Sequence, residues 1–134
     1  MTADARAEDR ARPGARAALS AFAVDAALVL VFAVIGRASH GENVVDGLWA
    51  TAWPFLTALV AGWLVAVAWR APFAPVRTGL PVWAVTVAVG MLLRALSGQG
   101  TAVAFVVVAA LTLLVFLVGW RLIAVRRRRA RTAR

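Results

Sequence analysis

Four long apolar runs, separated by short polar connections, make up most of this chain. The runs cover residues 17–36, 48–69, 80–96 and 101–123, and each has the length that a helix needs to cross a bilayer. Polar or turn-forming residues fill the intervals between them. We therefore predict an all-α fold, an integral membrane bundle of four transmembrane helices, with tails at residues 1–16 and 124–134.

The two tails differ from the runs in composition. Residues 1–16 are mostly charged or small, and Pro13-Gly14 is expected to break any helix, so we predict a disordered tail. A cleaved signal peptide also begins with basic residues and an apolar stretch. The first run is longer than the usual 7–15 residues of such a stretch and contains an acid, which favours a retained helix.

Composition agrees with a membrane protein. The 134 residues are 63% hydrophobic, whereas soluble domains are about half apolar. The chain has no room for a sizeable soluble domain beside four spans. It contains no cysteine, which excludes disulfides, thiol chemistry and cysteine-bound metal.

The arginines predict the orientation. All fifteen basic residues are arginine, and thirteen of them lie before span one, between spans two and three, or after Trp120; only Arg37 and Arg94 fall on the other side. Basic residues concentrate on the cytoplasmic side of membrane proteins. We therefore expect a cell-membrane, multi-pass protein with both termini in the cytoplasm. The tryptophans agree with this, since only Trp63 is expected to lie deep in the membrane.

One acid stands inside the first span. Asp25 lies eight residues beyond Ala17, about 12 Å from the cytoplasmic end. Thr86 and Thr112 fall at similar depth in spans three and four, so the three form a candidate intramembrane polar site. A buried acid in a membrane is either an ion or proton site or a group that fixes helix packing, and both readings stay open. A direct pair with Arg94 is disfavoured by about 9 Å of depth.

A second candidate site lies at the opposite end of the bundle. Arg37, Ser39, His40 and Arg94 are expected to form an outward-facing polar mouth. The simpler interpretation makes the two arginines interfacial anchors and the histidine a solvated loop residue.

Motifs of enzymes and metal sites are missing from the sequence. One histidine with scattered acids is no metal signature, and we find no nucleophile–base pair or phosphate loop. We therefore expect no enzyme, no catalytic residue, no metal and no cofactor. The arginine run at 126–134 follows a span directly, which favours anionic lipid over nucleic acid as its partner. The bilayer is the other expected partner, and a second copy or another membrane protein is left open.

Several motifs together resemble a known family. They comprise Asp25 with Phe32, Gly36-Arg37-x-Ser39-His40, Thr51-Ala52-Trp53-Pro54-Phe55, Gly62-Trp63, Val82-Trp83, Thr86-Val87, Gly90-Met91-Leu92-Leu93-Arg94, Gly98-x-Gly100 and Phe105-Val106. On these residues the chain resembles an uncharacterised bacterial membrane family, common in actinobacteria, catalogued as domain of unknown function 3054. The resemblance covers most of residues 17–121 and implies a four-helix membrane protein without an established activity.

Two hypotheses for function follow. In the first, the protein is a small transporter or permease subunit with Asp25 as a protonatable site. Small multidrug-resistance exporters are similar in placing an acid in the first of four helices, although this is an analogy of fold alone. In the second, the protein is a non-catalytic membrane scaffold or accessory subunit in which Asp25 and the threonines fix helix packing.

Overall fold

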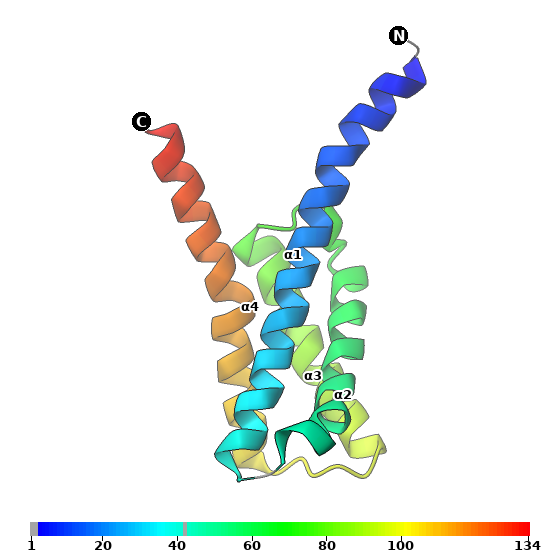
Figure 1. The fold of residues 1–134 in the computed structure, drawn as a ribbon, viewed down its shortest axis with the longest axis vertical. Coiled ribbons are helices and arrows are strands. Elements are labelled where there is room, and N and C mark those ends of the chain that lie inside the picture. Colours follow the sequence, from blue (N-terminus) through cyan, green and yellow to red (C-terminus); the bar gives the residue numbers. More distant parts are fainter. Residues whose placement is uncertain (1–2, 42) are drawn as a thin grey trace.

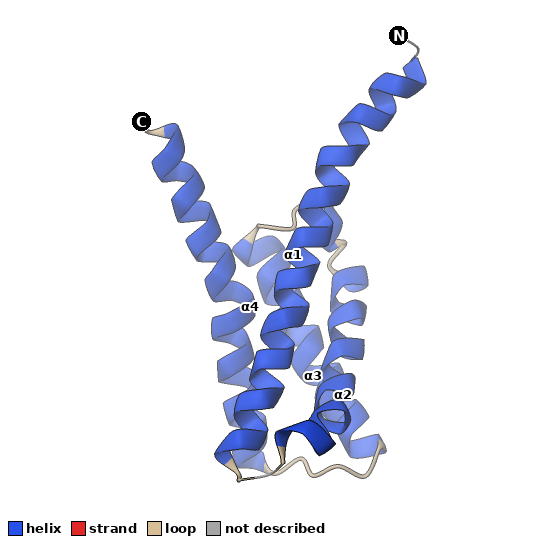
Figure 2. Cartoon of the chain, viewed as in Figure 1, coloured by secondary structure: helices blue, strands red, loops and turns tan. Residues whose placement is uncertain are grey.

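The computed structural model describes the backbone of residues 3–41 and 43–134 and the side chains of residues 14–41 and 43–134. Every regular element in these residues is a helix (Figure 2). The elements are α1 (Ala3–Ser39), α2 (Val44–Val65), the short 3-10 helix η1 (Ala68–Arg70), the short π-helix η2 (Pro75–Gly79), α3 (Leu80–Leu96) and α4 (Val103–Thr132). The predicted all-α class is therefore confirmed.

Four of these helical segments are long and apolar enough to cross a membrane. They are Gly14–Ser39, Val44–Val65, Pro75–Leu96 and Val103–Thr132. The start of α1 and the end of α4 lie at the same end of the bundle (Figure 1), as an even number of crossings requires. We call this the terminal end, and we call the end formed by the α1–α2 and α3–α4 connections the far end.

Helix α1 extends beyond the first apolar run. It begins at Ala3 and passes through Pro13 and Gly14, where the sequence predicts a disordered tail. Alanine and arginine, which dominate this segment, are good helix formers, and a helix already formed in the bundle needs no new nucleus to continue. The helix therefore projects from the terminal end in Figure 1.

Helix α2 starts and stops earlier than the apolar run suggests. Asn43 caps it by accepting a hydrogen bond from the Val45 backbone N–H at 3.1 Å, and Pro54 lies in its interior. A proline there cannot donate to the carbonyl four residues earlier, and this bends helices. In Figure 1 the first turns of α2 accordingly run across the far end before the helix turns along the bundle.

The connection from α2 to α3 is compact. Val67 takes a left-handed conformation with φ of 48°, which ends the helix before the expected boundary at residue 69. η1 and η2 follow, and the hydroxyl of Thr78 donates to the carbonyl of Ala71 at 2.7 Å. This hydrogen bond closes the connection between η1 and η2.

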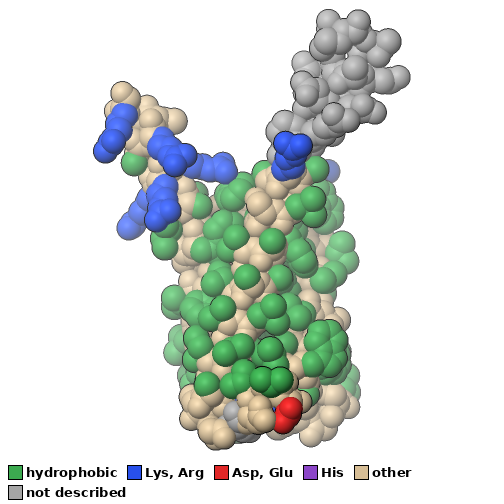
Figure 3. Space-filling view, viewed as in Figure 1, with side chains coloured by type: hydrophobic (Ala, Val, Ile, Leu, Met, Phe, Trp, Pro, Cys, Tyr) green, Lys and Arg blue, Asp and Glu red, His purple; other side chains and the backbone are tan. Residues whose placement is uncertain are grey.

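The four long helices form a ring in which each contacts the next one in the chain and α1 contacts α4. Helices α2 and α3 pack most extensively. Glycines permit this closeness: Gly62 lies against the backbone of Val82, and Gly90 lies against the ring of Phe55. The face of the bundle seen in Figure 3 is mainly hydrophobic, and arginines gather at its terminal end.

Candidate functional site

Asp25 lies on the face of α1 that points into the bundle. The residues buried on this face recur every three or four positions, as a helix requires: Ala21, Asp25, Val29, Phe32 and Ala33. Asp25 itself is fully buried, with no exposed surface. An acid in this position has to be satisfied by groups of the protein.

Three side chains from two other helices donate hydrogen bonds to Asp25. Arg121 donates from Nη1 to Oδ1 at 2.9 Å and from Nη2 to Oδ2 at 2.7 Å. The indole N–H of Trp120 donates to Oδ1 at 2.8 Å, and that of Trp63 donates to Oδ2 at 2.8 Å. Each carboxylate oxygen thus accepts two hydrogen bonds, which is the full capacity of an ionised carboxylate. We call Asp25, Trp63, Trp120 and Arg121 the buried cluster.

Arg121 is as fully buried as its partner. Its Nε donates to the carbonyl of Pro72 at 2.9 Å, and Nη1 also donates to the carbonyl of Leu117 at 2.6 Å. The guanidinium therefore joins α1, α4 and the α2–α3 connection. Its aliphatic part lies beside Gly79, where a Cβ would come within 3.3 Å of the Arg121 Cδ.

Aromatic rings enclose the buried cluster. Phe22 meets Trp63 edge to face with centroids 5.3 Å apart, and Phe73 meets Trp120 in the same way at 5.8 Å. Such contacts fix the planes of the two indoles, and with them the directions of their N–H groups. The donors are thus held in place around the carboxylate.

The two threonines of the predicted polar site make no described hydrogen bond to Asp25. Thr86 is buried, but its hydroxyl lies opposite Gly62 and has no hydrogen-bond partner among the described residues. Thr112 is partly buried on α4. The described hydrogen bonds to Asp25 come from arginine and tryptophan, so the structure assembles a different polar layer around the acid.

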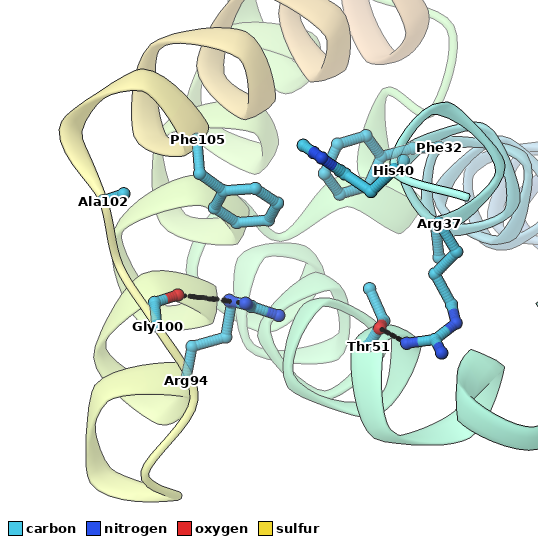
Figure 4. A pocket seen from close by; sticks show the side chains of 10 residues that line it. Phe32, Arg37, His40, Thr51, Arg94, Gly100, Ala102 and Phe105 are labelled. Carbon is cyan, nitrogen blue, oxygen red and sulfur yellow. Dashed lines mark hydrogen bonds between the residues drawn. The ribbon is translucent and has the colours of Figure 1, made fainter. Parts of the chain in front are cut away.

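A pocket of about 250 Å³ opens at the far end. All four long helices or their connections contribute to its lining, which consists of Phe32, Ala33, Gly36, Arg37, His40, Thr51, Arg94, Gly100, Ala102 and Phe105. Figure 4 shows Arg37 and Arg94 reaching the pocket from opposite sides. Three of the four residues expected at the polar mouth thus share one cavity.

Both pocket arginines are positioned by hydrogen bonds. Arg37 donates from Nε and Nη2 to the carbonyl of Asn43 and from Nη1 to the hydroxyl of Thr51 at 3.2 Å. Arg94 donates to the carbonyl of Gly100 and to the side chain of Gln99, and its guanidinium lies 4.4 Å from the centroid of the Phe105 ring. These contacts place Arg94 at the far end, as its sequence position suggests.

The other expected mouth residues are exposed. His40 lines the pocket from the end of α1. Ser39 is outside the lining, and its hydroxyl donates to the carbonyl of Gly36 at 2.9 Å. Ser39 therefore ends the helix rather than facing the pocket.

Three phenylalanines separate the pocket from the buried cluster. Phe32 contacts Phe55 edge to face at 5.1 Å between centroids, and Phe105 lies 6.4 Å from each. Phe32 follows Asp25 by seven residues on α1, or about 10 Å along the helix. The pocket and the buried cluster are thus two distinct polar sites with an apolar layer between them.

Arg121 and the two indoles are the site residues that the sequence reasoning missed. The position of Arg121 in the last turn of the predicted fourth span, after Trp120, groups it with the arginines of the cytoplasmic side. However, it continues the series Ala109, Leu113 and Leu117 at steps of four, and four apolar residues follow it before Arg126. An arginine on the buried stripe of a span, at the depth of an acid in another span, is a recognisable signal for a pair.

One family of known proteins matches most of this chain. A family model described as "Protein of unknown function (DUF3054)" matches residues 22–124, a range that contains both the buried cluster and the pocket. No curated protein and no solved structure matched the chain. The chain belongs to the DUF3054 family of proteins of unknown function.

Proposed function

We propose that this multi-pass membrane protein is a non-catalytic scaffold or accessory subunit, and that the buried cluster fixes the packing of its helices. The observation that carries the proposal is the full hydrogen-bonding of Asp25 by Arg121, Trp63 and Trp120. A proton on Asp25 would occupy an oxygen lone pair that already accepts an N–H. The geometry therefore favours a permanently paired carboxylate over a proton carrier.

The energetics of burial point the same way. An isolated charge in the interior is strongly unfavourable, and a buried pair is tolerated where geometry is good and the remaining donors and acceptors are satisfied. Both conditions hold here, because the pair is bidentate and the Arg121 guanidinium has two further carbonyl partners. The buried cluster would contribute specificity, since its hydrogen bonds require α1, α2 and α4 to pack together around Asp25.

A small transporter or permease subunit is the second candidate. The far-end pocket favours it, since a cavity between helices that is closed on one side by Phe32, Phe55 and Phe105 is suited to a substrate entering from the far end. In that case the substrate would bind in the pocket, and the buried cluster would stay a structural element.

The bilayer and its lipids are the partners of this proposal. We place the terminal end in the cytoplasm of the cell membrane on the arginine distribution. The basic tail would there attract anionic lipid, at about 1 kcal/mol per charge. Arg128 stacks on Phe73 at 4.0 Å from the ring centroid, which would keep part of the tail near the membrane surface. A second copy or another membrane protein would complete a scaffold.

The test compares Asp25→Asn with the wild type in reconstituted protein. We expect the variant to lose thermal stability or assembly. A stable, fully folded and fully assembled variant would reject the structural role and leave the transporter as the better candidate.

A further inference from the structure

We propose that the far-end pocket binds a small oxyanion, a carboxylate or phosphate group, between Arg37 and Arg94. This inference goes beyond the scaffold role and is independent of the buried cluster, which lies on the other side of the three phenylalanines. Two guanidinium groups and one imidazole line this cavity of about 250 Å³ (Figure 4).

The chemistry of the lining selects the class of ligand. A planar guanidinium matches the two oxygens of a carboxylate or phosphate by donating two N–H groups side by side. In both arginines Nε and Nη2 already donate to a backbone carbonyl, so an oxyanion that binds through that edge would exchange with the carbonyl. The hydroxyl of Thr51 lies within hydrogen-bond distance of Arg37 and adds a neutral polar group to the same wall. Two cations and a hydroxyl on a concave surface favour an anion with several oxygens over a cation or a purely apolar molecule.

The arginines are held in position before a ligand arrives. Arg37 is tied to the start of α2 through Asn43 and Thr51, and Arg94 to the α3–α4 connection through Gln99 and Gly100. An arriving oxyanion would add to these contacts or exchange with them, and a side chain already ordered loses less entropy on binding. Gly47 contributes to this order, because any Cβ there would collide with the Arg37 guanidinium.

The size and the apolar wall limit the rest of the ligand. Pockets for drug-sized ligands are typically about 300–1,000 Å³, so this cavity suits a smaller molecule or a single head group. Phe32, Ala33, Ala102 and Phe105 form its apolar side. We therefore expect a small carboxylate or phosphate ester with a short apolar part, either free in solution or as the phosphodiester of a lipid.

The experiment measures binding to the full chain in lipid nanodiscs by calorimetry. The probes are acetate and inorganic phosphate in phosphatidylcholine discs, and phosphatidylglycerol retention by native mass spectrometry is measured separately. We expect at least one probe to bind, and Arg37→Gln or Arg94→Gln to weaken it by tenfold or more. Arg77→Gln, an exposed arginine at the terminal end, is the matched control and should bind like the wild type.

A second pair of variants keeps both arginines. A Cβ at Gly36 meets open space within the pocket lining, so Gly36→Leu should fill the cavity and abolish binding without disturbing the bundle. Gly119 on α4 is equally open but outside the lining, so Gly119→Leu should leave binding unchanged. Equal binding by Gly36→Leu and Gly119→Leu would overturn the proposed location.

The same experiment distinguishes a soluble anion from a lipid head group as the ligand. Phosphate or acetate bound in phosphatidylcholine discs identifies a soluble anion, and arginine-dependent retention of phosphatidylglycerol alone identifies a lipid head group. Glu42 adjoins this region in the sequence but lies outside the described residues. Glu42→Gln is measured as well, because this variant removes a carboxylate able to compete with the ligand for the arginines. Absence of binding in both the wild type and Glu42→Gln would overturn the proposal, while the stability of Asp25→Asn would still decide the scaffold role.

Discussion

Arg121 holds both carboxylate oxygens of Asp25 although the two residues are 96 positions apart in the chain. One is in the first span and the other near the end of the last, and neither has exposed surface. Their pairing joins the first and last membrane helices, and the indoles of Trp63 and Trp120 complete the coordination of the acid. The buried ion pair therefore holds together two helices that are distant in sequence.

Breaking the ion pair on one side should be far more harmful than replacing both partners. Arg121→Gln leaves a buried carboxylate without its cation, and we expect a loss of about 3–5 kcal/mol in unfolding free energy. The double variant Asp25→Leu with Arg121→Met removes both charges and should recover much of this loss. Denaturant titration in mild detergent measures both, and a double variant less stable than either single one would contradict a pairwise lock.

The indole donors should contribute individually. Trp63→Phe and Trp120→Phe each remove one hydrogen bond to the charged acid, for an expected loss of about 1.5–3 kcal/mol. Trp83→Phe is the matched control, because the Trp83 indole donates at 2.8 Å to the neutral carbonyl of Ala110, and about 0.5–1.5 kcal/mol is expected. Thermal unfolding of the three variants measures these losses of stability. Equal losses in all three would mean that packing of the ring, rather than the hydrogen bond to a charged group, dominates.

Glycine at position 90 should be required for the packing of α2 on α3. A Cβ there would lie 2.6 Å from the buried Phe55 ring, so Gly90→Ala should cost about 1–3 kcal/mol through overpacking. The same change at Gly119 meets no atom within 4 Å and should instead stabilise α4 by about 0.5–1 kcal/mol. Opposite shifts in melting temperature are the expected result, and a stable Gly90→Ala protein would argue against this helix contact.

Val67 should be a site where stability is easily gained. A β-branched residue with φ of 48° is strained, by about 1–2 kcal/mol, whereas glycine adopts this conformation freely. We expect Val67→Gly to raise the unfolding free energy by up to about 1 kcal/mol. The gain is the relief of backbone strain minus the packing lost with the half-buried valine side chain. Ala66→Gly, at a right-handed position, is the control and should destabilise the protein.

The proposed orientation can be tested by labelling, since the chain has no cysteine of its own. A single cysteine at Thr132 should be inaccessible to a membrane-impermeant thiol reagent in intact cells, and one at the exposed Ser39 should react. Permeabilised cells control for reactivity and should label both. Labelling of Thr132→Cys from outside would reverse the topology inferred from the arginines.

The apolar runs by themselves determined the all-α class and the four crossings, because hydrophobic length is a local property of a membrane helix. The family resemblance came from the short motifs within and between these runs. Helix α3 runs from Leu80 to Leu96, the same residues as the third apolar run. Ends set by backbone geometry were less predictable: a cap at Asn43 and a left-handed Val67 move α2 four residues toward the N-terminus of the predicted run. The far-end meeting of Arg37, His40 and Arg94 followed from topology alone.

The partners of Asp25 were decided only by the tertiary structure. Depth along a helix made Thr86 and Thr112 reasonable candidates, but depth does not determine which face of each helix turns inward or how far a side chain reaches. A long arginine of α4 and an indole from α2 can both reach the acid, whereas the hydroxyl of Thr86 lies opposite Gly62. Rotation and packing of whole helices select these contacts, and they are collective properties that no single span encodes.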